Sequence, residues 1–599
     1  RAANATGINI LGAAFVSISG MSSKGTKWRT NQLVYVAEGL DQLILSKEAC
    51  ESLGLIERNF PTIGSYGSAE INTHTYSGGE DDLGGGNYNF PQQVMQVEED
   101  VLTPCIPRPD GTCSCPRREL PPPPPPCPSG KSPDQMKRII INHYAASSFN
   151  RCMRQALPQM KGEPMPIITD PNVKPVAVHR PVPVPLHWMK KVKEDLDQDV
   201  HLGIIEPVPI NTPTSWCSRM VIVPKSSGEP RRTVDYKALN DASVRQTHHT
   251  KSPFALASEV PRGTVKSVLD VWNAYHSVPI RAEDKDKTTF ITPWGRYRYL
   301  RAPQGYLSSG DGFTHRDQLT SQAIKNKVTL VDDNMVWDAT VEENFVSVCK
   351  LLDIYGKAGL VMNSDKFQFG KETVNFAGME ITKDAIRPAR EYLDAIRNFP
   401  VPKTISSMRS FYGMINQVNY AFLMSEHMEP FRHLLKSDTP YCWSPILQEK
   451  FDIAKQMIVD AVTEGVERFD MKRKTCLATD WSNSGIGFFL MQKYCSCDKE
   501  TPRCCKTGWK LVLAGGRSTN PAESRYSPIE GECLAIADAL HKAKHYVLGC
   551  DNLLLATDHK PLVGVFSKNL EEIENPRLLS IAEKTMWFKF TTIHVPGKL

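Results

Sequence analysis

The sequence lacks long hydrophobic runs. No stretch approaches the roughly 18 consecutive apolar residues that a membrane-spanning helix needs. The chain also lacks a charged segment followed by an apolar one at its start, which is the pattern of a secretory leader. No internal repeat is visible. The absence of a span predicts that the chain has no membrane partner, and without a leader nothing in the sequence marks secretion.

The chain has little excess of charge of either sign. Its 599 residues carry a formal net charge of +5, which is compatible with a nucleic-acid partner without arguing for one. It is 41% hydrophobic and 23% charged, which is ordinary for globular protein. The length exceeds what one core can fill and predicts about three to five domains. The first residue is Arg rather than Met, so we expect a fragment or a processed piece.

The sequence lacks the tidy CxxC…CxxC spacing of common zinc sites, although it has 16 cysteines. Cys349 and Cys533 fall at core-like positions, which predicts a mostly reduced protein. Two clusters stand out. The first comprises Cys105, Cys113, Cys115 and Cys127, and the second comprises Cys495, Cys497, Cys504 and Cys505. Four close thiols could hold zinc, so zinc binding remains open at both clusters.

The composition changes along the chain. Residues 1–60 hold short apolar runs that predict strands followed by a short helix. Residues 61–160 are predicted to be a disordered linker, with Gly-rich "SGGEDDLGGG" and a proline run at 121–126 that favours an extended segment. Later residues are globular. A β-rich unit gives way to a helical one near 401–406, and strand–turn–strand patterning follows from 474.

Two adjacent aspartates, Asp332 and Asp333, stand between apolar runs in "KVTLVDDNMVW". At an effective dielectric of 20, two carboxylates about 4 Å apart repel by about 4 kcal/mol. One interpretation is a turn that joins the strands of a hairpin. The other is a site for a divalent cation. This stretch alone leaves both open.

A third aspartate, Asp270, lies near the end of the apolar segment "VKSVLDV". If this segment is a strand beside the pair Asp332–Asp333, the three carboxylates converge. Mg²⁺ favours one or two carboxylates together with substrate phosphates. Two such ions can activate an attacking hydroxyl and stabilise leaving pyrophosphate. The alternative is three unrelated surface acids.

Five motifs occur in a particular order. They are "WCSRMVIVPKSSGEPRRTVDYKALN", "LDVWNAYHSVPI", "TTFITPWGRYRYLRAPQGYLSSGDGF", "LVDD" and "GLVMNSDKFQFGKETVNFAGMEI". In this order they resemble the reverse transcriptase of a gypsy-like LTR retrotransposon polyprotein, over roughly residues 165–599. The resemblance implies an α/β (α+β) fold with the fingers, palm and thumb of a right-hand polymerase.

The resemblance also implies roles for individual residues. Asp270 and Asp332 would bind both metal ions, and Asp333 would be the weaker ligand. Lys225 and Arg231 match the finger residues that hold the incoming triphosphate, and a cation and a guanidinium suit phosphate oxygens. The alternative for both basic residues is a solvated surface.

Further positions match the nucleotide and primer sites of the family. Tyr275 lies where a bulky ring would collide with a ribose 2′-OH, although it could be a core tyrosine. Gln304 matches the residue near the sugar and the template pair, although it could be a loop amide. Residues 376–378 fall at the primer grip. Leu330 replaces the tyrosine of the family's Y-x-D-D box, so we expect altered rate or fidelity.

A second acidic group follows. "TCLATD" ends at Asp480, "LLLATD" ends at Asp558, and Glu532 lies in the predicted helix "SPIEGECLAIADAL". In that helix Ser527 and Glu530 form a capping box, which leaves Glu532 without a structural duty. The order resembles a ribonuclease H domain and implies that the three acids bind metal. Each could instead be a surface acid.

Two parts of the resemblance are incomplete. The fourth carboxylate of a ribonuclease H would follow "HVPGK", and the sequence stops at Leu599, so nuclease activity is uncertain. The first residues weakly resemble the tail of a retropepsin-like domain, but neither Asp-Thr-Gly nor Asp-Ser-Gly occurs, so we predict no protease activity. The predicted domains are a retropepsin-like tail (1–60), a linker (61–160), fingers and palm (161–403), thumb and connection (404–467) and a ribonuclease H-like domain (468–599).

The predicted function is RNA-directed DNA synthesis by two-metal nucleotidyl transfer from a dNTP to a primer 3′-OH. The expected cofactor is Mg²⁺, with Mn²⁺ as the alternative. The expected partners are RNA and DNA template–primers, RNA–DNA hybrids, dNTPs and other Pol or Gag products, in a cytoplasmic particle or the nucleus. The alternative is a catalytically decayed or co-opted nucleic-acid-binding fragment. An RNA-synthesising polymerase is disfavoured by Tyr275 and by the nuclease-like domain.

Overall fold

A computed structural model of the chain describes residues 10–21, 27–37, 118–152, 154–225, 228–423, 427–435, 440–499, 501–502, 504–505 and 507–596. The chain divides into two units, residues 1–101 and 102–599.

In the first unit the structure describes an antiparallel hairpin. Its strands are β1 (Ile10–Met21) and β2 (Lys27–Ala37), and Phe15 pairs with Leu33 at their middle. The strands expected in this region are therefore confirmed. The short helix expected after them, the "SGGEDDLGGG" stretch and three cysteines of the first cluster (Cys105, Cys113 and Cys115) lie outside the described residues.

The end of the predicted linker is folded, which corrects that prediction. Helix α2 (Pro133–His143) begins with a capping box formed by Ser132 and Gln135, and strand β3 (Phe149–Asn150) follows it. Tyr144 is fully buried, and its hydroxyl donates a hydrogen bond to the Cys349 carbonyl at 3.0 Å. Only one side of this helix is apolar, and its partner lies more than 200 positions later in the sequence. Composition alone therefore could not distinguish the helix from a linker.

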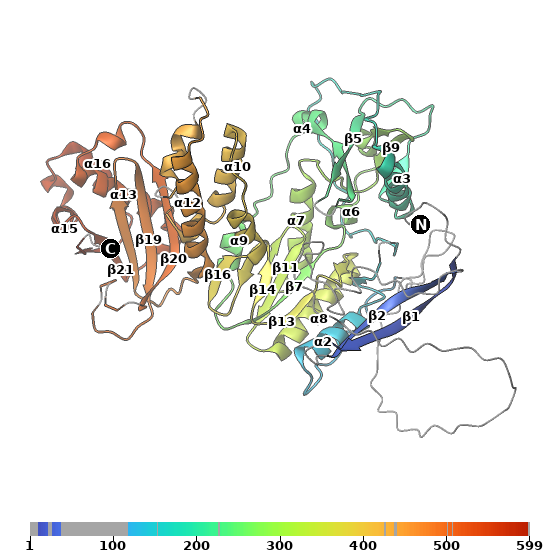
Figure 1. Cartoon of the computed structure of the whole chain (residues 1–599), viewed down its shortest axis with the longest axis horizontal. Coiled ribbons are helices and arrows are strands. Elements are labelled where there is room, and N and C mark those ends of the chain that lie inside the picture. The colour runs from blue at the N-terminus through green and yellow to red at the C-terminus, as the bar shows by residue number, and fades with distance from the viewer. Residues whose placement is uncertain are drawn as a thin grey trace. The chain divides into compact units, whose positions relative to one another are not determined.

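The fingers contain a five-stranded sheet in the order β4-β9-β8-β5-β6. The strands are β4 (Ile205–Pro207), β5 (Ser218–Pro224), β6 (Pro230–Asp235), β8 (Phe290–Thr292) and β9 (Gly295–Tyr299). Helix α3 (Leu186–His201) contacts β4 and β6, and α4 (Lys237–Ala242) follows β6. Figure 1 labels both helices together with strands β5 and β9 of this sheet. Strands β5 and β6 pair antiparallel and form the predicted finger hairpin.

The palm sheet has the order β10-β11-β7-β13 and is covered on both faces. Its strands are β7 (Val265–Asp270), β10 (Lys327–Leu330), β11 (Asp333–Asp338) and β13 (Gln368–Lys371). Because side chains alternate along a strand, Leu269 faces the core that contains helix α8 (Val341–Ala358), and its neighbour Val268 faces a second core. Helix α7 (Ser309–Ser321) packs on α8.

The second core belongs to a smaller sheet and the connecting helices. The sheet has the order β14-β15-β16-β17, with β14 (Val374–Phe376), β15 (Met379–Ile381), β16 (Ala385–Pro388) and β17 (Val466–Glu467). Helices α5 (Pro253–Ser258), α9 (Arg390–Arg397), α10 (Ile405–Asn416) and α12 (Pro445–Thr463) surround it. Met408, Phe411 and Ile415 of α10 are fully buried, as their helical spacing predicted.

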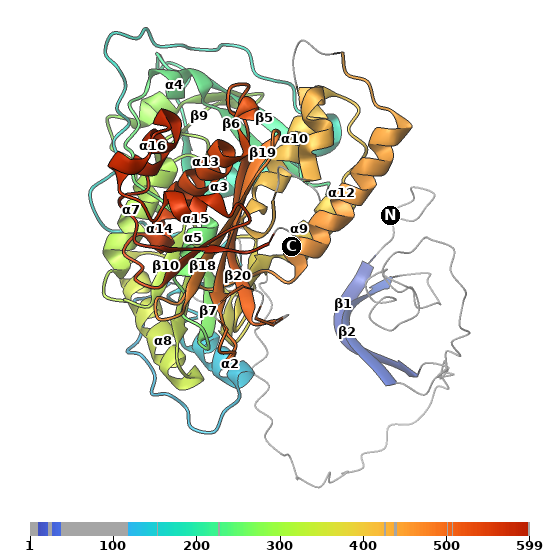
Figure 2. The ribbon, with the colours of Figure 1, turned by 90° about the vertical axis from the view of Figure 1, so that its left-hand side faces the viewer.

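The last sheet has the order β20-β19-β18-β21-β22. Its strands are β18 (Thr475–Trp481), β19 (Gly485–Lys493), β20 (Trp509–Ser518), β21 (Leu553–Thr557) and β22 (Thr591–His594). Strands β18, β21 and β22 are parallel, and the other pairs are antiparallel. Figure 2 shows α13 (Pro528–Lys542) and α16 (Pro576–Glu583) together in front of this sheet. The five strands were predicted, but β22 is shorter than the apolar pattern "WFKFTTIHV" suggested.

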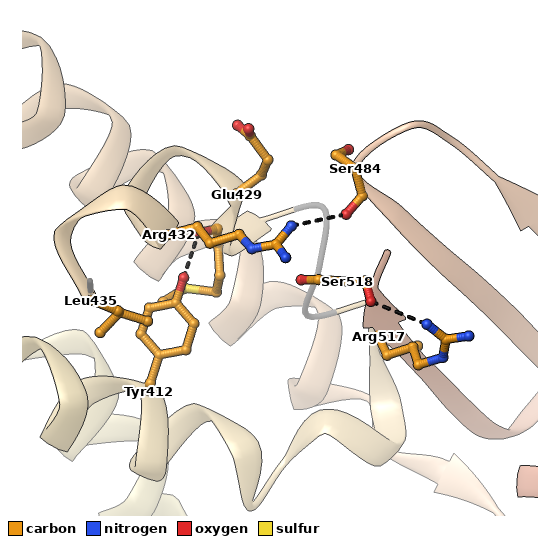
Figure 3. Close-up of a pocket in the computed structure, with 9 residues that line it drawn as sticks. Tyr412, Glu429, Arg432, Leu435, Ser484, Arg517 and Ser518 are labelled. Carbon is orange, nitrogen blue, oxygen red and sulfur yellow. Dashed lines mark hydrogen bonds between the residues drawn. The ribbon is translucent and has the colours of Figure 1, made fainter. Parts of the chain in front are cut away.

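Side chains fix the last sheet to the connector. Leu511 and Leu513 of β20 pack against the connector core. Arg432 of η3 (Glu429–Leu435) donates to the carbonyls of Ser484 at 3.4 Å and Thr519 at 3.2 Å, beside a cavity of about 230 Å³ (Figure 3). The junction is therefore packed rather than a loose tether.

The segment between β17 and β18 is also held in place. Arg468 is buried, and its guanidinium donates to the carbonyls of Thr382 at 2.6 Å and Lys383 at 2.8 Å, which lie between β15 and β16.

In the described part of the chain, no helix is both long and apolar enough to cross a membrane.

Candidate active sites

The palm sheet brings three predicted aspartates to one edge. Asp270 is the last residue of β7, and Asp333, the first residue of β11, pairs with it in register. Asp332 lies in the tight turn between β10 and β11, and its carbonyl accepts a hydrogen bond from the Val271 amide at 2.8 Å. The hairpin interpretation of this stretch is confirmed. The turn also lies beside Asp270, as the cation interpretation required.

The backbone of this turn is strained. Val331 has a φ of 55°, in the left-handed region that a β-branched residue rarely adopts. Such a conformation costs on the order of 1–3 kcal/mol and persists only where surrounding structure enforces it. Here the strand pairing on both sides enforces it. Strain of this kind is typical of a functional turn.

The carboxylates repel one another. Burial, followed by the charges of Asp332 and Asp270, raises the pKa of Asp333 to about 6. Burial and then Asp270 also raise the pKa of Asp332. The charge of Lys366 and a hydrogen bond from the Ala377 backbone oppose the rise at Asp333. The site therefore carries more negative charge than its surroundings neutralise, and a bound cation would relieve it.

A cavity of about 260 Å³ opens at these aspartates. It is lined by Asp270, Val271, Trp272, Asn273, Ala274, Tyr275, Gln304, Val331, Asp332, Asn363 and Lys366. The structure thus brings Asp270 and Asp332 together with Tyr275 and Gln304, which sequence reasoning assigned to one site. Tyr275 lies in the short helix α6 (Ala274–Ser277), where its ring meets Phe313 edge-on with centroids 6.3 Å apart. Asp333 does not line this cavity.

The predicted triphosphate residues lie elsewhere. Lys225 and Arg231 are exposed on the β5–β6 hairpin and do not line the palm cavity. The hairpin is held there by backbone bonds, such as the one from the Lys225 amide to the Glu229 carbonyl at 2.8 Å. The predicted primer-grip segment, residues 376–378, is closer to the aspartates, because Ala377, at φ 51° in the β14–β15 turn, hydrogen-bonds to Asp333 through its backbone.

The second acidic group also converges. One ligand atom from each of Asp480, Glu532 and Asp558 lies within 4.8 Å of the others. Asp480 is near the end of β18 and Asp558 directly follows β21. Because these strands are parallel neighbours, their carboxyl ends meet at one edge of the sheet. Helix α13 brings Glu532 to the same edge.

A glycine allows this helix to approach the sheet. A Cβ atom at Gly531 would lie 2.2 Å from the indole ring of Trp481, so only glycine fits there. The close approach lets the Trp481 amide donate to Glu532 Oε1 at 3.2 Å. Glu530 instead completes the predicted capping box with Ser527 and pairs with Arg577 at 3.0 Å. The sequence-based prediction that Glu530, and not Glu532, caps the helix is confirmed.

Glu532 is suited to a cation. Its side chain is buried, and its Oε2 atom has no hydrogen-bond partner among the described residues. Burial, then the charges of Asp480 and Asp558, raises its pKa to about 8. An unpartnered buried carboxylate oxygen is costly unless a ligand satisfies it. A divalent ion held by these three acids would do so.

Comparison with known proteins agrees with this geometry. Residues 223–381 match the family "Reverse transcriptase (RNA-dependent DNA polymerase)", and residues 470–587 match the "RNase H-like domain found in reverse transcriptase". The chain therefore contains a reverse transcriptase domain followed by an RNase H-like domain, an order that supports a retrotransposon Pol polyprotein. A domain of the reverse transcriptase family implies the use of divalent metal ions.

Several relatives and solved structures are similar to this chain. The Transposon Tf2-3 and Tf2-7 polyproteins of Schizosaccharomyces pombe are each 28% identical over 423 residues, which cover 70% of this chain and 30% of the polyprotein. A foamy viral protease-reverse transcriptase in complex with dsDNA matches with a TM-score of 0.66 and 19% identity, over 78% of this chain and 96% of that one. The same viral protein with an RNA/DNA hybrid gives 0.65 and 19%, over 78% and 62%. These structures share the fold.

Sequence reasoning missed two lysines of the reverse transcriptase palm. Lys366 Nζ lies 2.8 Å from Asp270 Oδ2 and forms an ion pair there. Lys327 is the first residue of β10 in the aspartate hairpin, and its buried ammonium group contacts Asp317 at 2.9 Å and Asn334 at 2.7 Å. The sequence does contain a signal for Lys327, because it is a charged residue at the start of an apolar strand. A lysine in such a position is buried only when a partner pairs with it. The Lys366 pair joins residues 96 positions apart and left no local signal.

Proposed function

We propose that this chain synthesises DNA on RNA and DNA templates by transferring nucleotides from dNTPs to a primer 3′-OH. One observation carries the proposal: Asp270 and Asp332 share a cavity with Tyr275 and Gln304 at the edge of the palm sheet. The raised pKa values of Asp332 and Asp333 support a cation at this edge. We favour Mg²⁺ over Mn²⁺, because hard carboxylate and phosphate oxygens are its usual ligands.

The protein groups have distinct tasks in this proposal. Asp270 and Asp332 hold the divalent ions, which when bound polarise the phosphate and stabilise the leaving pyrophosphate. Lys366 holds Asp270 in position until a metal ion competes for it. Tyr275 limits the space beside the sugar, so that a 2′-OH is excluded by shape.

Two further assignments rest on chemistry and family resemblance. Lys225 and Arg231 take the triphosphate, because their exposed charges suit phosphate oxygens and lie on a hairpin that can receive a substrate. Gln304 contacts the nucleotide from the cavity wall. Leu330 is partly buried against the second core, so it supports the turn by packing and not by the hydrogen bond that a tyrosine could make.

The second site supports a second activity. We propose that Asp480, Glu532 and Asp558 hydrolyse the RNA strand of an RNA–DNA hybrid, which the convergence of their ligand atoms supports. The substrates are therefore RNA and DNA template–primers, dNTPs and hybrids, and the proposed location is a cytoplasmic particle or the nucleus with other Pol and Gag products. The viral relatives solved with dsDNA and an RNA/DNA hybrid support nucleic-acid partners of this kind.

Primer extension on an RNA template tests the polymerase proposal. Wild-type chain should extend a DNA primer only with a divalent ion, and Asp332→Asn should lose at least about a hundredfold in rate, because one ligand of both ions loses its charge. Asp241→Asn, an exposed aspartate paired with Lys237 on α4, is the matched control and should keep wild-type activity.

The alternative is a nucleic-acid-binding fragment without turnover. That reading would be correct if the folded wild-type chain bound template–primer and never extended it. Equal extension by wild type and Asp332→Asn would instead remove the metal assignment.

A further inference from the structure

The connection between β19 and β20 is unusually long for a hairpin. It comprises residues 494–508, "YCSCDKETPRCCKTG". Most hairpin loops have about 2–5 residues, and loops beyond about 12–15 residues without secondary structure are uncommon in compact domains. Apart from Tyr494, this one has no large apolar side chain. It has no hydrophobic core of its own, so some other interaction must order it.

Four cysteines of this loop meet at one point. The Sγ atoms of Cys495, Cys497, Cys504 and Cys505 all lie within 4.8 Å of one another. Four thiolates around one zinc ion, with Zn–S bonds of about 2.3 Å, would be separated by about 3.8 Å. The cluster is thus close to the size of a tetrahedral thiolate site.

The four side chains are free thiols and not disulfides. Cys495 Sγ and Cys504 Sγ are 3.3 Å apart, whereas a disulfide bond measures about 2.05 Å. A neutral thiol is a weak hydrogen-bond donor and acceptor, so contacts among four thiols stabilise a polar loop very little. A cation that binds all four would supply the missing stabilisation.

The backbone is shaped to let the sulfur atoms approach. A Cβ atom at Gly508 would lie 2.5 Å from the Sγ atoms of both Cys495 and Cys505, so the loop closes only with glycine at this position. The Tyr494 amide donates to the Gly508 carbonyl at 2.6 Å and joins the two ends of the loop. Lys493 donates to the Cys497 carbonyl. The cysteines are therefore held together from outside the cluster as well.

We propose that Cys495, Cys497, Cys504 and Cys505 bind one Zn²⁺ ion in a closed four-thiolate site. Tetrahedral sulfur ligation is typical of zinc and of iron–sulfur centres, and four sulfur atoms this close together suit a single ion rather than a cluster. The four thiols release four protons as the ion binds, and the site then carries a net charge of −2. With four protein ligands no position is left for water, so the role of the ion is structural.

The ordered loop lies beside the polymerase part of the chain. The ring of Tyr494 lies under the guanidinium of Arg262, which precedes β7, at 4.8 Å, and under that of Arg473 at 4.0 Å. Arg262 also pairs with Glu467 of β17 at 3.1 Å. Zinc would thus fix the loop whose first residue, Tyr494, contacts Arg262 of the polymerase part.

Metal analysis of the full chain tests the site. Protein purified in reducing, chelator-free buffer should contain close to one zinc per chain, and Cys495→Ser and Cys504→Ser should each lose most of it. Cys442→Ser is the matched control, because Cys442 is an exposed free cysteine outside the cluster, and it should keep the metal. Asp480→Asn should also keep it, which separates this site from the carboxylate site and makes the result independent of catalysis.

Cobalt substitution reads the ligands directly. Wild-type chain stripped of metal and titrated with Co²⁺ should develop thiolate-to-cobalt charge transfer and the strong visible bands of a tetrahedral sulfur site, saturating near one equivalent. This titration needs no variant and so covers the case in which a serine variant does not fold. The proposal is overturned if reduced chain binds neither ion, if Cys495→Ser keeps its zinc, or if thiol alkylation and mass analysis find the four cysteines in disulfides.

Discussion

Glu532 is a single residue whose protonation reports on its site. Its pKa, raised to about 8 from an ordinary 4.5, means that the folded chain holds a proton there at neutral pH in the absence of a divalent ion. A group with a raised pKa contributes stability below its unfolded value and loses that contribution as pH rises through the folded value. Between about pH 4.5 and 8, this residue therefore makes the metal-free chain less stable as pH increases.

Replacing Glu532 by Gln should flatten that dependence, because a neutral amide cannot release a proton. We expect the urea concentration at the unfolding midpoint, measured in buffer without divalent cations, to decrease as the pH is raised from 5 to 8 for wild type. The decrease should be smaller for Glu532→Gln. Glu583→Gln, an exposed glutamate at the end of α16, should behave like wild type. Parallel curves for wild type and Glu532→Gln would show that Glu532 ionises normally.

At the scale of elements, the approach of α13 to β18 decides whether the second site forms. Gly531→Ala places a methyl group against the Trp481 ring, and overpacking of this kind costs typically about 1–3 kcal/mol. We expect lower unfolding free energy and loss of hybrid cleavage, because Glu532 moves away with its helix. Gly413→Ala in α10 is the control: nothing lies within 4 Å of its Cβ position, and alanine suits a helix interior better. Wild-type cleavage by Gly531→Ala would show that the helix position is not critical.

The elements that were predictable share a physical cause. Strand ends such as Asp270 and Asp480 follow from short apolar runs, and the α13 cap follows from local Ser–Pro–Glu chemistry. Helix α2 was missed because its partner is distant in sequence and prolines precede it. The position of the fingers hairpin relative to the palm, and hence of Lys225, depends on sheet packing that no local pattern encodes.

At the scale of the whole molecule, the fingers offer basic residues for binding nucleic acid. Arg219, Lys225 and Arg231 are exposed there. Phosphate contacts by such residues release counterions, so template–primer affinity should fall linearly on a log–log plot against salt, with a slope of about −0.9 for each duplex phosphate contacted. Fluorescence anisotropy with a labelled duplex between low and physiological salt measures this slope. Lys225→Ala should make it shallower, whereas a slope near zero in wild type would mean that the phosphates are not contacted.

The buried Arg468 fixes more than the stability of the chain. Because its guanidinium holds two carbonyls between β15 and β16, only residues 469–474 separate this anchor from β18. The carboxylate sites of the palm and the last sheet are therefore joined through a short, anchored segment. If both sites act on one hybrid and this anchor keeps their separation constant, each cut in the RNA would fall at a set number of nucleotides behind the growing DNA end, whatever the sequence between them.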